Sequence, residues 1–474
     1  MDKASGVKDK AIPVVGAEAV GQDLYASRVK IHPREVTGRF SSLRRLAVWV
    51  LLGIFYLVPW MHWGDRQMVL FDLPARKFYI FGFSFFPQDF LYLTFFLIIC
   101  ALSLFLFTAL AGRLWCGYAC PQTVWTEVFI WIEQKIEGNR LKRMKLDRQP
   151  LNRHKILLRG AKHAVWILFA LWTGFTFVGF FTPIADLGAR TLSLDLGPWE
   201  SFWIIFYAFA TYGNAGWMRE QVCMYMCPYA RFQSAMFDKD TLVIAYDETR
   251  GEQRGSRKRN SDYRAEGLGD CIDCTMCVQV CPTGIDIRDG LQYQCIGCAA
   301  CIDACDAVMD KVGYARGLVR YTTENAVQGK PIHVLRTRTL IYTGLLLTLI
   351  VALLVSIALR TPLGLDVLRD RNSLYRQTGE GLVENVYTLK LINMDERRHR
   401  YVLSVTGIPG MKLIRGDQPI VAESGAVISV PVRIQVDPGD LQHTSTEITI
   451  TARAKTDPDI RVEEKARFLG PLQR

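Results

Sequence analysis

The chain has 474 residues, 50% of them hydrophobic, and its formal net charge is +11 at pH 7. This length exceeds one ordinary domain and predicts about two or three structural units. The positive charge is weak evidence for a nucleic-acid partner, because the basic residues flank apolar segments and do not cluster on one soluble face. It fits an interaction with an anionic membrane leaflet.

The N-terminal tail, residues 1–42, is mostly polar. About the first 25 residues have the composition of a disordered segment. The apolar segment that follows lacks a small-residue cleavage site, so a cleavable signal peptide is not predicted.

Five windows contain no charged residue, and each is close to the ~20 residues that a helix needs to cross about 30 Å of hydrocarbon. One such window fits a buried core helix, but five in one chain indicate an integral membrane protein. The predicted transmembrane spans are Leu46–Gly64, Phe90–Gly112, Ala164–Ala185, Ser201–Met218 and Thr339–Arg360 without its final arginine.

A cysteine motif follows both the second and the fourth span. Residues 116–129 read CGYACPQTVWTEVF and residues 223–236 read CMYMCPYARFQSAM, so both begin C-x-Y-x-C-P. Arg113 and Arg219 stand just before the two motifs. Each motif leads into an amphipathic stretch, the first of which forms a predicted cytoplasmic segment around residues 121–160. The pattern indicates a duplicated unit of span, thiol motif and surface helix.

The candidate catalytic and copper-binding residues are the cysteines of these motifs, Cys116, Cys120, Cys223 and Cys227. Proline is well tolerated at the first position of a helix, so Cys120 and Cys227 are predicted to cap the helices that follow. The helix dipole and the unpaired N–H groups there lower the pKa of a thiol and favour the thiolate. A cysteine four residues earlier can point to the same side of a helical turn. Each pair then offers two soft ligands, which suits Cu(I).

Other interpretations of these four thiols stay open. They can converge into one site, act as a dithiol redox couple, or serve as small buried hydrophobic residues at a membrane edge. Two matching pairs, upstream of the cysteine-rich region described next, favour a functional role.

A cytoplasmic region is predicted over residues 218–338, with a ferredoxin module at 265–312. Residues 271–282 read CIDCTMCVQVCP, and residues 295–305 read CIGCAACIDAC. Each has the spacing C-x2-C-x2-C-x3-C of bacterial ferredoxins, in which the fourth cysteine binds the other [4Fe–4S] cluster. A zinc site commonly uses two C-x2-C pairs and fits this duplicated pattern poorly. The first cluster is assigned to Cys271, Cys274, Cys277 and Cys305, and the second to Cys295, Cys298, Cys301 and Cys281.

Two clusters in one module indicate a one-electron relay. No G-x-G-x-x-G follows a strand pattern, so NAD or FAD binding is not predicted. The basic stretch at residues 251–260 is interpreted as a mobile linker. His62 and His163 lie at opposite membrane faces and cannot together ligate one haem iron, so both are interpreted as interfacial side chains.

The C-terminal domain, residues 361–474, changes to period-two alternation rich in Val, Ile and Thr. This pattern predicts a small antiparallel sandwich of immunoglobulin-like type, here without a disulfide. It holds no catalytic constellation, and His399 and His443 are interpreted as surface histidines. Such a domain suits docking of a partner.

The basic residues also predict the orientation. They are abundant before the first span and between the second and third spans, and sparse in the other two loops between spans, which places the N-terminus in the cytoplasm. Five crossings then place the C-terminal domain outside. Twelve of the thirteen cysteines fall on the cytoplasmic side, Cys100 lies inside the second span, and none lies in the outer domain. A disulfide framework would show the opposite distribution.

Taken together, the five spans, the two C-x-x-x-C-P motifs, the eight-cysteine module before the last span and the outer sandwich resemble the CcoG family. This family is also called FixG or RdxA and comprises cytochrome c oxidase accessory proteins. The resemblance covers nearly the whole chain apart from the N-terminal tail. It implies a polytopic α-helical protein of the bacterial inner membrane with five transmembrane helices, a cytoplasmic 2[4Fe–4S] ferredoxin domain and a periplasmic immunoglobulin-like β-sandwich.

The resemblance also implies an activity, the reduction of Cu(II) to Cu(I) during assembly of a cbb3-type haem–copper oxidase. The implied partners are oxidase assembly factors and copper chaperones, with a cytoplasmic or quinol electron donor and a plausible homodimer. One alternative is a quinol-linked membrane ferredoxin subunit that passes electrons to a respiratory partner. Another is a non-enzymatic assembly scaffold with structural clusters.

Overall fold

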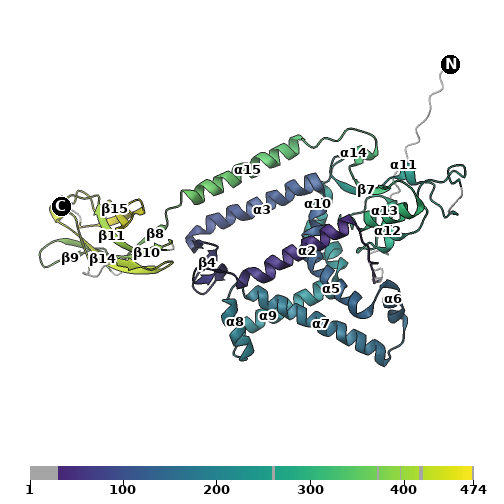
Figure 1. Ribbon diagram of the computed structural model, residues 1–474. Coiled ribbons are helices and arrows are strands. Elements are labelled where there is room, and N and C mark those ends of the chain that lie inside the picture. The colour runs from purple at the N-terminus through teal and green to yellow at the C-terminus, as the bar shows by residue number, and fades with distance from the viewer. Residues whose placement is uncertain (1–29, 259–261, 371–372, 396, 416–419, 472–474) are drawn as a thin grey trace, which may run out of the picture.

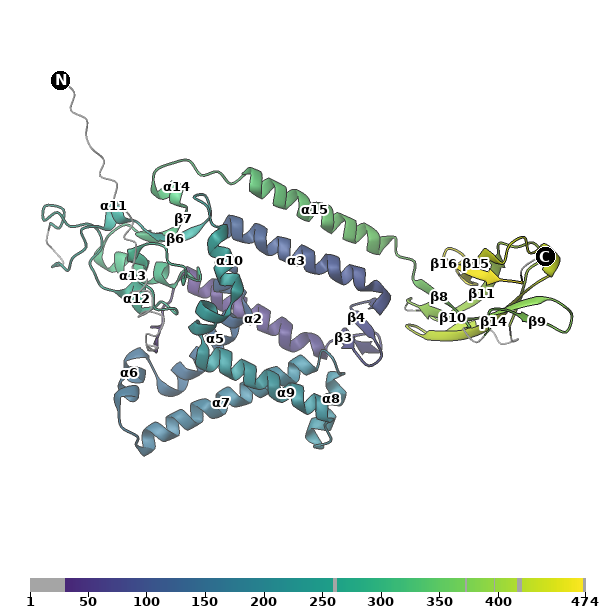
Figure 2. The same ribbon diagram turned by 180° about the vertical axis from the view of Figure 1, so that it is seen from behind.

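The computed structural model describes residues 30–258, 262–370, 373–395, 397–415 and 420–471. The predicted disordered tail lies outside this part of the chain, as does the end of the basic stretch at residues 251–260. Long helices form the middle of the molecule, with the ferredoxin elements at one end and the β-sandwich at the other (Figures 1 and 2). The long helices are α2 (Arg39–Leu57), α3 (Phe90–Ala111), α7 (Arg153–Val178), α9 (Pro198–Thr211) and α15 (Thr337–Ala358).

Within the described residues, four helices are long and apolar enough to cross a membrane: Arg39–Trp60, Pro87–Ala111, Arg153–Val178 and Thr337–Ala358. None of the residues in the most apolar windows of α3 and α15 is buried inside the protein. Helices that expose so much apolar surface are suited to contact with lipid. The apolar helices therefore match four of the five predicted spans.

The fourth predicted span, Ser201–Met218, differs from a simple membrane helix. Its α-helical part, α9, has 14 residues, which is shorter than a span needs, and continues as the π-helix η3 (Tyr212–Met218). The change to a wider turn lets the chain pack closely, since a Cβ on Gly216 would lie 3.1 Å from the ring of Phe129. Five crossings thus stay a prediction.

The third span also differs, because α7 begins at Arg153 and ends at Val178 instead of covering Ala164–Ala185. Asn152 caps it by accepting a hydrogen bond from the backbone N–H of Lys155 at 2.8 Å. The charge-free window located the apolar part of this helix but not its polar first turns.

The elements that connect these helices lie at their two ends. At the sandwich end lie the loop strands and turns β1 (His62–Trp63), β2 (Arg66–Gln67), β3 (Val69–Asp72), β4 (Lys77–Ile80), β5 (Phe83–Phe85), η1 (Val58–Trp60), η2 (Pro87–Asp89) and α8 (Ile184–Leu192). At the ferredoxin end lie α4 (Leu114–Tyr118), α5 (Pro121–Glu137), α6 (Arg140–Arg148), the π-helix η4 (Val222–Met226) and α10 (Pro228–Met236).

The ferredoxin unit is built around two short antiparallel strands and a central helix. Its elements are β6 (Val243–Tyr246), α11 (Glu248–Gly251), α12 (Met276–Gln279), η5 (Ile287–Asp289), α13 (Ala300–Val312), β7 (Val319–Thr322) and α14 (Glu324–Val327), with β6 paired to β7. Asp303 on α13 accepts hydrogen bonds from the backbone N–H groups of Phe40 at 3.2 Å and Ser41 at 2.7 Å. A carboxylate of the ferredoxin unit therefore caps the first membrane helix.

The C-terminal domain consists of two packed antiparallel sheets, as its alternating pattern predicted. The sheet orders are β12-β14-β10-β8, with β9 beside β10, and β13-β11-β15-β16. The strands are β8 (Leu363–Arg369), β9 (Arg376–Gln377), β10 (Val383–Asn393), β11 (His399–Thr406), β12 (Lys412–Ile414), β13 (Ile420–Ala422), β14 (Val427–Val436), β15 (Ser445–Ala454) and β16 (Arg461–Leu469), with η6 (Pro438–Asp440) between β14 and β15. His443 is exposed, as expected.

The prediction that His399 lies on the surface is wrong. Its side chain is buried, and its ring nitrogens contact Asp395 Oδ2 at 2.6 Å and Thr456 Oγ1 at 3.2 Å. The sequence did not show this, because the partners of the ring come from a neighbouring turn and from the far end of another strand.

Candidate functional site

The eight cysteines of the ferredoxin unit surround two cavities. One cavity is lined by Cys271, Cys274, Cys277 and Cys305, together with apolar side chains such as Met309. The other is lined by Cys281, Cys295, Cys298 and Cys301, with Cys277 also at its wall. We call these the first and the second cavity. The two groups of four are those expected from the crossed ferredoxin pattern.

Left-handed backbone turns aim these cysteines at the cavities. Thr275 (φ 55°) and Ala299 (φ 58°) cap α12 and α13, and each directly follows a cysteine. The residues just before those cysteines, Asp273 (φ 53°) and Gly297 (φ 68°), have the same hand. Left-handed non-glycine residues are uncommon and mark positions at which the surrounding structure fixes the backbone. The two cysteine motifs, which share one spacing, therefore also share one backbone conformation around the second cysteine.

Burial changes the protonation of these thiols. It raises the pKa of Cys277 to about 11 and the pKa of Cys295 and Cys305 to about 12. Metal binding must therefore release protons from them. Within the described residues, no group of three or more His, Cys, Asp or Glu side chains is arranged to hold a single metal ion. Four thiols spread around each cavity instead fit a cluster, whose iron atoms lie at separate corners.

The two C-x-Y-x-C-P motifs lie at the same end of the molecule as the ferredoxin unit (Figure 1). Cys120 and Cys227 are the N-cap residues of α5 and α10, and a proline occupies the first helical position after each, as predicted. Cys116 lies in the α-helical turn α4, whereas Cys223 lies in the π-helix η4. The matched sequences therefore adopt different local structures before the shared cap.

The prediction that a helix N-terminus lowers the pKa of the capping thiol is wrong for Cys120, and the cysteines four residues before the two caps are protonated as well. Burial raises the pKa of Cys116 to about 11 and that of Cys223 to about 12. Burial also raises the pKa of Cys120, although backbone N–H groups of Thr123 and Gln122 act in the opposite direction. Removal from water outweighs the short helix dipole, so these thiols are protonated at neutral pH without metal.

The structure brings the four motif thiols together, and we call them the thiol set. Besides burial, the neighbouring thiols of Cys120, Cys116 and Cys227 disfavour ionisation of Cys223. The four cysteines therefore lie close enough to interact electrostatically. Cys116 Sγ donates to the buried Gln233 Oε1 at 3.3 Å. The buried Nε2 of Gln233 has no hydrogen-bond partner among the described residues. The four thiols are half-buried soft donors, and the described residues do not arrange three or more of them around a single metal position.

The thiol set lies directly against the second cavity. Gly117, between the two cysteines of the first motif, packs so closely that an added Cβ would lie 2.8 Å from Cys298 Cα. A Cβ on Gly297 would likewise lie 3.1 Å from the backbone carbonyl group of Arg113. Two glycines thus allow main-chain contact between the motif and the loop of the second cavity. The one feature of the sequence that could have indicated this contact is Gly117, a residue without a side chain between Cys116 and Cys120.

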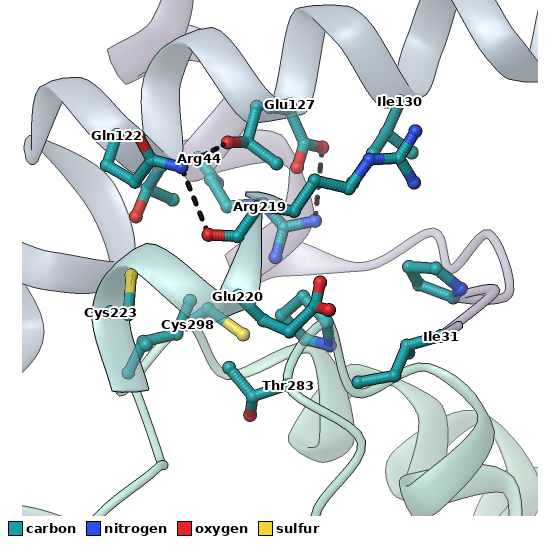
Figure 3. A pocket seen from close by; sticks show the side chains of 15 residues that line it. Ile31, Arg44, Gln122, Glu127, Ile130, Arg219, Glu220, Cys223, Thr283 and Cys298 are labelled. Carbon is teal, nitrogen blue, oxygen red and sulfur yellow. Dashed lines mark hydrogen bonds and ion pairs between the residues drawn. The ribbon is translucent and has the colours of Figure 1, made fainter. Parts of the chain in front are cut away.

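A third cavity lies between α5, η4 and the ferredoxin loops (Figure 3). Cys223 and Cys298 both lie in its wall, so it touches both the thiol set and the second cavity. Arg44 Nη2 and Glu127 Oε1, 3.3 Å apart, form an ion pair at one side. The rest of the lining is Ile31, Pro33, Gln122, Thr123, Thr126, Ile130, Arg219, Glu220, Pro282, Thr283 and Ile296.

A buried ion network supports α5 behind the thiol set. Glu133 is completely buried and is paired with Arg219, the arginine that precedes the second motif. Lys162 Nζ lies 2.7 Å from Glu137 Oε1. Burial alone would raise the pKa of Glu133, but Arg219 and the neighbouring lysines lower it to about 2. The carboxylate is therefore ionised at neutral pH. Sequence patterning missed this network because its members come from separate elements.

Family models match three parts of the chain. Residues 93–139 match a model described as "4Fe-4S binding domain", which covers the first thiol motif. Residues 218–324 match "4Fe-4S dicluster domain", and residues 353–471 match "IG-like fold at C-terminal of FixG". The chain thus carries iron–sulfur domains followed by an immunoglobulin-like domain.

Relatives of known name match most of the chain. It is 41% identical to the nitrogen fixation protein FixG of Rhizobium meliloti over 433 residues, covering 83% of this chain and 82% of that one. It is 42% identical to protein RdxB of Cereibacter sphaeroides over 423 residues, covering 86% and 87%. A crystal structure of a FixG-related protein from Vibrio parahaemolyticus is 36% identical, covers 23% of this chain and 98% of that one, and gives a TM-score of 0.22. Because the named relatives match most of its length, and because it carries apolar helices and paired cysteine cavities, the chain belongs to the FixG (CcoG) family of membrane iron–sulfur proteins of electron-transfer type.

Proposed function

We propose that this protein reduces Cu(II) to Cu(I) for the assembly of a cbb3-type cytochrome c oxidase. The observation that carries the proposal is the contact of Gly117 with Cys298, which brings a ligand of the second cavity against the turn of Cys116. Electron transfer depends on such proximity between donor and acceptor. Four soft thiols beside an electron source suit a metal that becomes softer on reduction.

The residues of the chain have separate roles in this reaction. Cys271, Cys274, Cys277 and Cys305 would hold one [4Fe–4S] cluster, and Cys281, Cys295, Cys298 and Cys301 the other. Such clusters supply one electron at a time, which matches the one-electron change from Cu(II) to Cu(I). The ferredoxin unit is held in place at α2 by Asp303 and at α4 by the paired glycines.

The thiol set acts on the copper substrate. Because burial keeps Cys116 and Cys223 protonated in the absence of metal, copper binding releases protons from them. The same burial disfavours an empty thiolate site, so copper is not held as tightly as by preformed thiolates. Release of Cu(I) to an assembly partner is thereby made easier.

The test is the double substitution Cys116→Ala and Cys120→Ala in the full-length protein, purified without oxygen. We expect loss of cupric reduction, measured with a Cu(I) chelator, while the visible absorbance of the clusters is retained. Cys100→Ala is the matched control, because Cys100 is an exposed thiol on α3 away from both motifs. Unchanged reduction by the double variant would show that the thiol set is not the copper site.

The third cavity favours a second candidate, a quinol-linked electron-transfer subunit. Apolar side chains such as Ile130 and Ile296 line it together with Glu127 and Glu220, and it adjoins Cys298. Such a lining suits the head group of a hydroquinone. Oxidation of a soluble hydroquinone without copper, slowed by Ile130→Trp and unaffected by the double cysteine variant, would support this candidate. No hydroquinone oxidation would exclude it.

A further inference from the structure

Arg113 lies where the thiol set meets the second cavity. It caps α4, and its side chain is 7% exposed. Its Nη1 donates to the carbonyl oxygens of Tyr293 and, at 3.4 Å, Cys295, and its Nη2 donates to the carbonyl oxygen of Ala230. One guanidinium therefore joins the first motif, the loop of the second cavity and helix α10.

The hydrogen bonds of Arg113 leave its positive charge in place, because backbone carbonyl groups are neutral acceptors. After its own burial, the strongest electrostatic influences on Arg113 come from Cys116, Cys295, Cys223 and Cys227. Its charge thus acts on both the thiol set and the second cavity. Little water screens it there, so its field is stronger than that of a surface arginine.

The equivalent arginine of the second motif behaves differently. Arg219 donates to the carboxylate of Glu133 and, at 2.9 Å, to the carbonyl oxygen of Gly216. Its charge is neutralised by Glu133 and by the network behind α5. The two motifs are alike in sequence, but the charge of Arg113 faces thiols and the charge of Arg219 faces a carboxylate.

We infer that Arg113 is a positioning residue whose buried charge raises the reduction potential of the cluster that the second cavity would hold and strengthens the binding of metal by the thiol set. The inference rests on the proposed function only in naming copper as that metal. The cluster that the cysteines of the second cavity would hold supplies one electron when bound and would itself be oxidised, and the Cu(II) substrate would take up that electron to become Cu(I). A buried positive charge stabilises any nearby centre that gains an electron, and it also stabilises metal-bound thiolates. Cys116, its first electrostatic neighbour, belongs to the acceptor side.

The test compares Arg113→Gln, which removes the charge, with Arg113→Lys, which keeps it. Arg338→Gln is the matched control, because Arg338 also donates to a carbonyl of α10, that of Met236 at 2.8 Å, but at the helix end away from the motif. The readout is a redox titration of the copper-free, cluster-loaded protein, followed by electron paramagnetic resonance. We expect R113Q to lower the midpoint potential of the second cluster and to leave that of the first unchanged. R113K and R338Q should stay close to the wild type.

A second readout is the affinity for Cu(I), measured by competition with a chelator. Loss of an outer-sphere partner typically weakens metal binding roughly 10–100-fold, and we expect R113Q to fall in this range. Unchanged potential and affinity in R113Q, with only a lower melting temperature, would reduce Arg113 to a structural tether and overturn the inference.

A further variant covers the case in which R113Q does not retain its clusters. Gln233→Glu places a carboxylate beside Cys116, offsets the charge of Arg113 and leaves the bonds of the guanidinium in place. We expect it to lower the potential of the second cluster, and an unchanged potential would overturn the inference. The titration contains no copper, so it also separates this inference from the proposed function, which fails only if the double cysteine variant still reduces copper.

Discussion

The two C-x-Y-x-C-P motifs have the same sequence pattern and opposite surroundings. The first motif packs its Gly117 on the second cavity, and its Arg113 binds the loop of that cavity. The second motif has Met224 in the place of Gly117, and its Arg219 is neutralised by Glu133. The first motif therefore docks the electron source, and the second anchors the thiol set to the helices behind it. A duplicated motif can thus provide two different functions when only one copy contacts the partner domain.

The largest effect on stability is expected at the buried ion pair that holds the second motif. Glu133→Ala would leave Arg219 buried without its carboxylate. Breaking a buried ion pair by removing one partner costs roughly 3–5 kcal/mol. We expect a clear fall in the melting temperature of the detergent-solubilised protein, and Glu127→Ala, which removes a partly exposed partner of Arg44, should have a smaller effect. Equal effects of the two variants would contradict the assigned role of the network.

The same carboxylate gives a pH dependence. Its pKa is about 2 in the folded protein, below the ordinary value of 4.5. Glu133 therefore stabilises the fold fully above pH 4.5, and this contribution is lost as the pH falls through about 2. Acid unfolding followed by circular dichroism should begin at a higher pH in Glu133→Gln than in the wild type. If the acid-unfolding curves of the variant and the wild type coincide, the Glu133–Arg219 pair does not contribute to the stability of the fold.

The contact between the first motif and the loop of the second cavity is tested by Gly117→Val. A side chain there meets the backbone of Cys298, and overpacking typically costs about 1–3 kcal/mol. We expect slower electron transfer from the reduced clusters to copper, measured by stopped-flow absorbance. Met224→Val at the equivalent position of the second motif should leave this rate nearly unchanged. Similar rates in both variants would contradict the division of roles between the motifs.

A smaller effect is expected from the second attachment of the ferredoxin unit. Asp303→Ala removes the carboxylate that caps α2. Loss of a helix cap costs about 0.5–2 kcal/mol. Faster hydrogen exchange at the backbone amides of Phe40 and Ser41, by mass spectrometry, would show the loosened contact. Unaltered exchange in Asp303→Ala would mean that the cap does not hold the unit.

The smallest effect concerns thiol reactivity in both motifs. Burial raises the pKa to about 11 for Cys116 and to about 12 for Cys223, so in metal-free protein both thiols gain reactivity as the pH rises toward those values. Well below its pKa, a thiol gains roughly tenfold in thiolate fraction per pH unit. Alkylation mapped by mass spectrometry should therefore be slow at pH 8 and clearly faster at pH 9.5 for both cysteines. Labelling that does not change with pH in this range would contradict the raised pKa of these thiols.

Several features followed from sequence patterns alone. Cysteine spacing predicted the two groups of cysteines, because short loops fix the geometry of each triplet and the crossed ferredoxin pattern takes the fourth cysteine from the other motif. Period-two alternation gave the sandwich, and proline after Cys120 and Cys227 marked the starts of α5 and α10. Charge-free windows located the apolar helices but not the ends of α7, since its polar first turns are fixed by the cap of Asn152.

Other features depended on contacts between distant segments. The thiols of Cys116 and Cys223 are protonated because neighbouring elements bury them, and local helix-dipole reasoning could not include that burial. His399 is buried by partners 4 and 57 residues away in the chain.

The sequence by itself determined the ferredoxin-type cysteine spacing, the apolar helices and the existence of two thiol motifs, because these depend on residue type and short spacing. Only the tertiary structure decided that the motifs share one thiol set, that Gly117 contacts Cys298, and that Arg113 and Arg219 have different partners. The physical reason is that proximity, desolvation and charge compensation are properties of packed neighbours, and these neighbours come from elements far apart along the chain.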